Sequence, residues 1–81
     1  MIKSELKINI ERHYRDNSKL RIVKLLNDTM KLGLMKAKTL ADNLSFNDNT
    51  KIFNQEFDNL WNSLSKYDKQ LLRLYKHDNS N

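Results

Sequence analysis

The chain has 81 residues, a formal net charge of +5 and a pI near 9.6, with no cysteine, no proline and a single glycine. A chain of this length forms one domain with a modest core, and without cysteine it has no disulfide framework and no thiolate metal site. It also lacks an apolar run long enough for a membrane span and an N-terminal secretory leader, so we expect a cytoplasmic protein.

The composition favours helices along almost the whole chain, because straight-chain residues such as Leu, Lys and Met lose little rotamer freedom in a helix. The first predicted helix has apolar residues at helical spacing, namely Ile2, Leu6, Ile10 and Tyr14. Residues 4–12 also alternate between apolar and polar side chains, as a strand does. We favour the helix because its pattern extends further along the chain, and the strand is the alternative.

A second helix is predicted to begin at Asn17 and Ser18, whose short side chains can cap a helix N-terminus. Gly33 suits the left-handed position just past its C-terminal end. Most of the circumference of this helix is apolar, so we expect it to be the central and most buried one. Its apolar residues are Leu20, Ile22, Val23, Leu25, Leu26, Met30 and Leu32.

Two more helices are predicted over residues 36–44 and 50–63, with a turn at residues 45–49, where Asn, Asp and Ser favour turns and caps. The longer helix has one apolar face and one polar face. Its apolar face comprises Phe53, Phe57, Leu60, Trp61 and Leu64, with Ile52 at the rim.

Part of this region resembles a helix-turn-helix, in which a small residue lies where two short helices touch. The first half of that pattern is matched by Leu40, Ala41, Leu44 and Phe46. The second half departs from it, because Ser45 replaces the turn glycine and the polar Lys51 and Asn54 fall where buried aliphatic residues normally lie. A helix-turn-helix-like pair at residues 37–63 and a plain helical hairpin are therefore both open interpretations.

The last helix is predicted to begin at Ser65 and Asp68, which have the spacing of a capping box, and to extend to about Lys76. Residues 78–81 follow as a frayed tail, so a single helical domain is predicted over residues 1–77. Basic side chains recur along one side of this helix. The side chains expected to face inward are Tyr67, Leu71, Leu74 and Tyr75.

Charge is divided unevenly along the chain. Residues 1–38 hold ten basic and four acidic residues, residues 39–63 hold one basic and four acidic, and residues 64–81 hold four basic and two acidic. A recognition helix in the acidic middle would be repelled by a duplex, whereas the basic ends could neutralise phosphates. The nucleic-acid-binding candidates are Arg12, Arg15, Lys19, Arg21 and Lys24 of the N-terminal region and Lys66, Lys69, Arg73 and Lys76 of the last helix.

Residues with catalytic or metal-binding chemistry do not form a motif. His13 and His77 have no partner at a telling spacing, and one glycine cannot supply a phosphate-binding loop. We therefore expect no enzyme activity, no metal, no cofactor and no small-molecule substrate. A membrane-surface helix would take its apolar face away from a core this small, so no membrane partner is expected.

The sequence predicts an all-α fold, a small compact bundle of four to five short helices. Its centre is expected to comprise Val23, Leu26, Met30, Leu40, Leu44, Phe53, Phe57, Leu60, Trp61 and Leu71. The leading hypothesis is a non-enzymatic, nucleic-acid-binding accessory or regulatory protein, with DNA favoured over RNA. The alternative is a small protein-binding modulator, inhibitor or subunit that docks a helical face on a larger protein or on a second copy in a homodimer.

Overall fold

The computed structural model describes residues 1–76 and contains five helices in that range. They are α1 (Lys3–Arg15), α2 (Lys19–Met30), α3 (Leu34–Asp42), α4 (Thr50–Asn62) and α5 (Lys66–Leu74). The predicted all-α bundle is thus confirmed, and the strand alternative over residues 4–12 is wrong. His77 and the predicted tail at residues 78–81 lie outside the described residues.

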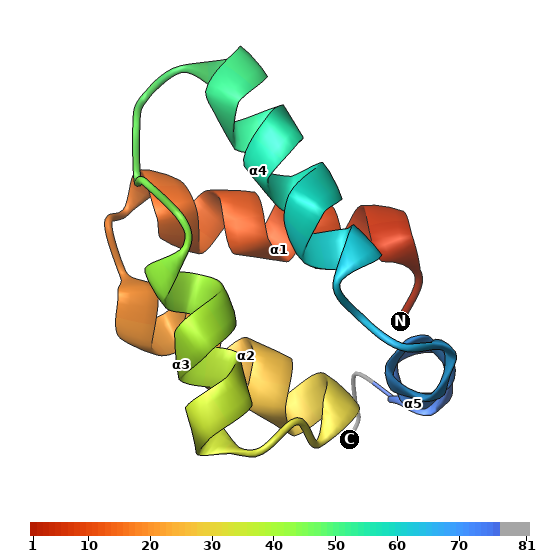
Figure 1. Cartoon of the computed structure of the whole chain (residues 1–81). Coiled ribbons are helices and arrows are strands. Elements are labelled where there is room, and N and C mark those ends of the chain that lie inside the picture. The colour runs from red at the N-terminus through yellow and green to blue at the C-terminus, as the bar shows by residue number, and fades with distance from the viewer. Residues whose placement is uncertain (77–81) are drawn as a thin grey trace.

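α2 contacts α1, α3 and α5, and in Figure 1 it lies behind α3. α4 lies across α1, where the rings of Tyr14 and Phe53 meet edge to face with their centroids 4.7 Å apart. The amino group of Met1 donates hydrogen bonds to the carbonyl oxygens of Leu72 and Tyr75, both at 2.9 Å. These bonds hold the start of α1 beside α5.

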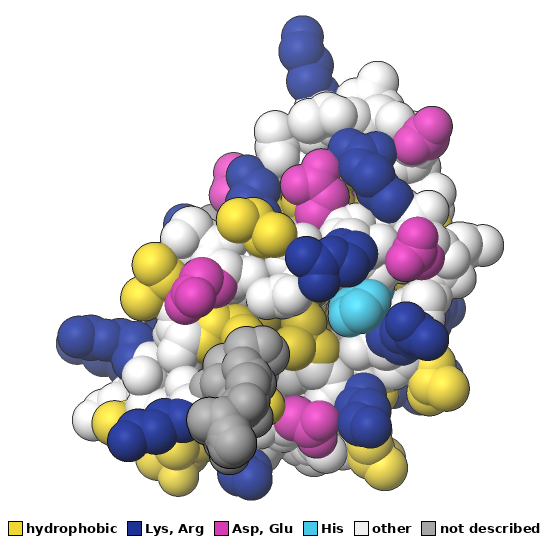
Figure 2. Space-filling view, turned by 180° about the vertical axis from the view of Figure 1, so that it is seen from behind, with side chains coloured by type: hydrophobic (Ala, Val, Ile, Leu, Met, Phe, Trp, Pro, Cys, Tyr) yellow, Lys and Arg dark blue, Asp and Glu magenta, His cyan; other side chains and the backbone are white. Residues whose placement is uncertain are grey.

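The surface mixes charges of both signs with scattered apolar side chains. On the face shown in Figure 2, acidic side chains lie among those of Lys and Arg. Leu20 was predicted to be buried with the rest of α2, but its side chain is 78% exposed, because it lies in the first turn beside an open groove between α2 and α3. None of the helices in residues 1–76 is long and apolar enough to cross a membrane.

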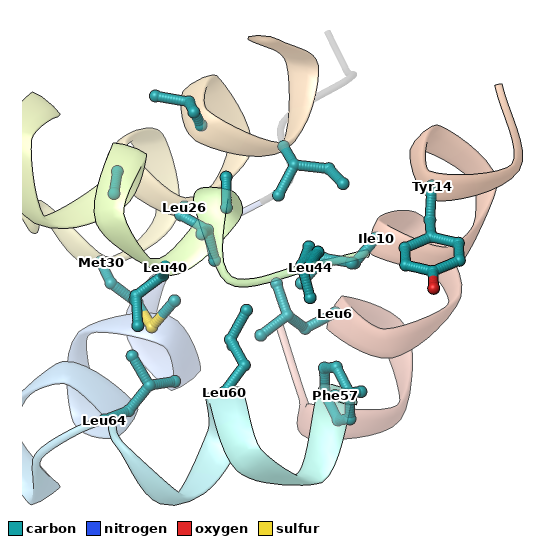
Figure 3. Close-up of a cluster of buried hydrophobic side chains, with 14 of the residues drawn as sticks. Leu6, Ile10, Tyr14, Leu26, Met30, Leu40, Leu44, Phe57, Leu60 and Leu64 are labelled. Atoms are coloured by element: carbon teal, nitrogen blue, oxygen red, sulfur yellow. The ribbon is translucent and has the colours of Figure 1, made fainter. Parts of the chain in front are cut away.

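The buried side chains form one cluster to which all five helices contribute. Figure 3 shows Leu6, Leu44 and Leu60 converging in this cluster from α1, from the residues after α3, and from α4. Trp61 and Leu71 are only partly buried, so their expected place at the centre is wrong. The residues expected there that are buried are Val23, Leu26, Met30, Leu40, Leu44, Phe53, Phe57 and Leu60.

The inward face of α5 differs from the predicted one. Leu72 is fully buried, whereas Tyr67 and Leu74, both expected to face inward, are exposed. Asp68 lies one turn before Leu72 and is buried with it, because its carboxylate accepts hydrogen bonds from the backbone N–H of Ser65 at 2.9 Å and from Nζ of Lys36 at 3.2 Å. These bonds compensate for the loss of water around the carboxylate.

The residues between α2 and α3 differ from the prediction that Gly33 ends α2. α2 ends two residues earlier than predicted, because Lys31, and not Gly33, takes the left-handed conformation just past the helix, with φ of 56°. Gly33 also has a positive φ, 89°, but it lies at the start of α3, where its N–H donates to Oδ1 of Asn27 at 2.9 Å. Ser18 stands at the N-terminus of α2 as predicted, although its side chain makes no capping hydrogen bond.

The connection between α3 and α4 comprises residues 43–49. It is longer than the three- or four-residue turn of a helix-turn-helix. α3 packs mainly along α2, whereas α4 lies across α1 (Figure 1). The two helices therefore lack helix-turn-helix geometry, which explains why the second half of that sequence pattern is unmatched.

Candidate nucleic-acid interface

The predicted nucleic-acid-binding residues are divided between two surfaces. Arg21 and Lys24 line a hollow of about 480 Å³ beside His13, and Arg12 is close enough to His13 to act on its charge. We call Arg12, Arg21 and Lys24 the α1–α2 cluster. Asp28 lines the same hollow, so this cluster is not purely basic.

The pKa of His13 is lowered by burial and by the positive charges of the α1–α2 cluster. Burial lowers the pKa of its imidazole below the usual 6.5, and the positive charges of Arg21 and Arg12 lower it further, while Asp16 acts in the opposite direction. Its Nδ1 is buried and has no hydrogen-bond partner among the described residues. Both observations favour a neutral imidazole at this position.

Two of the predicted residues are engaged in ion pairs. Arg15 contacts Glu11 at 2.8 Å and Asp48 at 3.1 Å, and Lys19 contacts Asp42 at 2.9 Å. Their positive charges are partly neutralised within the protein. Arg15 and Lys19 therefore contribute less to a phosphate-binding surface than their sequence positions indicate.

The second surface is built on α5. Lys66, Lys69 and Arg73 line one hollow, as their helical spacing predicts. Lys76 was predicted to continue this stripe, but α5 ends at Leu74 and Tyr75 has an extended backbone, so Lys76 is not part of the helical stripe. The predicted stripe of four basic residues thus contains three in the helix.

α1 adds basic residues that sequence reasoning missed. Nζ of Lys3 lies 5.2 Å from the centroid of the Trp61 ring, and Nζ of Lys69 lies 4.9 Å from the same ring. Nζ of Lys7 lies 5.8 Å from the centroid of Phe57, the preceding aromatic residue on this face of α4. Lys3 therefore joins α5 around Trp61, and we call Lys3, Lys66, Lys69 and Arg73 the α5 basic surface.

A cleft of about 320 Å³ opens within this surface, between the start of α1, the end of α4 and α5. Trp61 reaches it from the end of an aromatic row, in which its ring is 6.3 Å from that of Phe57. The hydrogen bonds of Met1 to α5 hold the neighbouring residues of α1 at its edge. Its lining comprises Ile2, Lys3, Trp61, Lys69, Leu72 and Arg73.

The α5 basic surface keeps its positive charge. None of its four side chains forms an ion pair within residues 1–76. Asp68, the single acidic residue of α5, is buried, and its carboxylate binds Ser65 and Lys36 on another side of the helix. Hydrogen bonds from those two residues outweigh the effect of burial and hold its pKa below the usual 3.8, so the carboxylate stays ionised at neutral pH.

Within residues 1–76, no group of three or more His, Cys, Asp or Glu side chains could hold a metal ion. Comparison of the chain with protein-family models, with curated proteins and with solved structures found no match.

Proposed function

We propose that this protein is a non-enzymatic, nucleic-acid-binding accessory or regulatory protein, with DNA as the favoured ligand. The observation that carries the proposal is the α5 basic surface, whose four cations have no acidic partner within the described residues. Such a surface attracts phosphates, and binding releases the counterions condensed on the nucleic acid. The α1–α2 cluster has a smaller role, because Asp16 and Asp28 lie beside it.

The number of cations sets the expected salt dependence. If all four residues of the α5 basic surface contact phosphates, the logarithm of the association constant falls with the logarithm of salt concentration with a slope of about −3 to −4. Phosphate contacts carry little sequence information, so affinity for unrelated sequences of the same length is expected to be similar.

Fluorescence anisotropy of labelled DNA at about 50 and about 200 mM salt tests the proposal. The double variant Lys69→Glu/Arg73→Glu is expected to weaken binding by at least about tenfold at the lower salt concentration, with unchanged helical circular dichroism. The variant Arg21→Glu/Lys24→Glu changes the net charge equally and alters only the α1–α2 cluster, so it is expected to lose less affinity. The absence of wild-type binding at low salt would contradict the proposal.

A second candidate function is docking on a protein partner, and an apolar groove on the surface favours it. A groove between α2 and α3 is lined by Leu20, Val23 and Leu34, and the side chains of Leu20 and Leu34 are 78% and 67% exposed. Exposed apolar side chains gathered in a groove are typical of protein contacts. Substitution of Leu20 and Leu34 by Ser is expected to abolish capture of such a partner while leaving DNA binding unchanged.

A further inference from the structure

The cleft around Trp61 combines an apolar floor with a basic rim. Ile2 and Trp61 supply accessible apolar lining over the buried Leu72, and Lys3, Lys69 and Arg73 supply three positive charges. A ligand that matches both parts has a flat, weakly polar ring joined to an anionic group. We infer that the cleft binds an unpaired nucleotide of single-stranded nucleic acid, with its base against Trp61 and its phosphates at the basic side chains; this inference rests on the proposed function and names its ligand.

The preference for a single strand over a duplex follows from which parts of a nucleotide the protein can reach. In a duplex, each base is stacked between its neighbours, and a protein meets only base edges and phosphates. In a single strand, the ring face of a base is free to stack on an aromatic side chain, and such stacking tolerates any sequence. A cleft that offers an indole between cations therefore favours a single strand, whereas a flat basic face would serve a duplex equally well.

A base can reach the indole of Trp61 because the lysine side chains over the ring can move aside. Trp61 is half-buried, and the groups over its ring are the ammonium ends of Lys3 and Lys69 at 5.2 and 4.9 Å. Each lysine has a flexible stem, so its ammonium can turn to a phosphate while its place over the ring is taken by a base. Neither lysine has an acidic partner within the described residues that would hold it in place.

The volume of the cleft suits one nucleotide and not a rigid duplex. At about 320 Å³ it lies near the lower end of the range for small-ligand pockets, about 300–1,000 Å³. The hollow beside Glu56, of about 370 Å³, has no cation in its lining, and the α2–α3 groove has no aromatic ring. The α1–α2 hollow combines the imidazole of His13 with Arg21 and Lys24, but Asp28 also lines it, whereas no acidic side chain lines the Trp61 cleft.

Trp61 is the only tryptophan of the chain, so its fluorescence reports on the cleft directly. The test titrates the whole protein with oligothymidylate of about 16 nucleotides, with a duplex of equal length and with inorganic polyphosphate. Single-stranded DNA is expected to quench the Trp61 emission and to bind at least about tenfold more tightly than the duplex. Duplex and polyphosphate are expected to change the emission much less, because they draw the lysines from the indole but place no base against it.

A matched pair of variants locates the effect. Ile2, which directly precedes α1, lines the cleft, and Ile8 within α1 does not, yet the two residues are 58% and 59% exposed. Ile2→Glu places a negative charge in the cleft and is expected to lower the affinity for single-stranded DNA by about tenfold, whereas Ile8→Glu, with the same change in net charge, is expected to lower it little. Trp61→Leu is expected to remove the preference for single strands while duplex binding persists.

The outcomes separate this inference from the proposed function. Equal affinity for single strand and duplex with unchanged Trp61 emission would overturn the base-binding cleft and leave the phosphate-binding function intact. Quenching by polyphosphate equal to that by DNA would also overturn it, because the cleft would then respond to charge alone. Failure of every nucleic acid to bind at low salt would overturn both proposals together.

Discussion

The imidazole of His13 lies between α1 and α2 with its Nδ1 buried and without a partner among the described residues. Burial and the charges of Arg21 and Arg12 lower its pKa below 6.5. The unfolded chain thus binds this proton more readily than the folded protein. The free energy of unfolding is therefore expected to fall as the pH drops through about 6.5, and this contribution levels off below the folded pKa.

The variant His13→Gln tests this expectation because it removes the titrating group. Urea unfolding at about pH 7.5 and about pH 5.5 is expected to show a larger loss of stability for the wild type than for the variant. The remaining groups are common to both proteins, so their contributions cancel in the comparison. The same pH dependence in both proteins would show that His13 is not responsible.

At the scale of the helix, the stability of α5 depends on the hydrogen bonds that cap its first turn. Oγ of Ser65 accepts a hydrogen bond from the backbone N–H of Asp68 at 3.0 Å, and the carboxylate of Asp68 accepts one from the N–H of Ser65 at 2.9 Å. The sequence predicts this reciprocal cap, and the structure confirms it. The ion pair of Asp68 with Lys36 also ties α5 to α3, which no sequence spacing indicates.

Replacement of Asp68 is expected to destabilise the protein through loss of this cap. Asp68→Ala should lower the free energy of unfolding by about 1–2 kcal/mol in urea at neutral pH, and Asp68→Asn should lower it less, because the amide oxygen still accepts from Ser65. The lowered pKa of Asp68 gives stability that is present above about pH 4 and is lost as the pH falls through the folded pKa. An alanine variant as stable as the wild type would contradict this role.

The sequence predicts the helices well, because the formation of each helix depends on the spacing of apolar residues and on the capping residues within its own segment. α4 was predicted over residues 50–63 and spans Thr50–Asn62. The inward face of α5 was predicted less well, because hydrophobicity alone places Leu74 inward and Asp68 outward. Burial of Asp68 depends on Lys36, a partner 32 residues away in the chain.

At the scale of the whole molecule, the candidate site could be predicted only in part. The alignment of Lys66, Lys69 and Arg73 follows from helical spacing within α5. The addition of Lys3 and Trp61 could not be predicted, because it requires the start of α1 and the end of α4 to meet α5. Pairing of Lys19 with Asp42 likewise depends on how α3 packs on α2.

One network joins three distant segments of the molecule. The hydroxyl of Tyr14 in α1 donates a hydrogen bond to Oε1 of Glu56 in α4 at 2.9 Å and accepts one from the N–H of Asn47 at 2.9 Å. Glu56 also accepts from the N–H of Ser45, at 3.1 Å to Oε1 and 3.2 Å to Oε2. These hydrogen bonds fix the long connection between α3 and α4 to α1, through Tyr14, and to α4, through Glu56.

The variant Tyr14→Phe keeps the ring packed against Phe53 and removes only the hydroxyl from this network. Asn47 then loses the acceptor for its N–H and Glu56 loses a donor, so the free energy of unfolding is expected to fall by about 1–2 kcal/mol in urea. Amide hydrogen exchange at Asn47 is expected to accelerate before global unfolding, because the N–H of Asn47 loses its hydrogen bond to α1. Tyr67→Phe is the control, since Tyr67 is exposed, and it should change neither quantity. If Tyr14→Phe matched this control in both measurements, the Tyr14 hydroxyl would not be needed, and the bonds of Glu56 to Ser45, the Arg15–Asp48 ion pair and the apolar contacts of Phe46 and Leu44 would suffice to hold the connection.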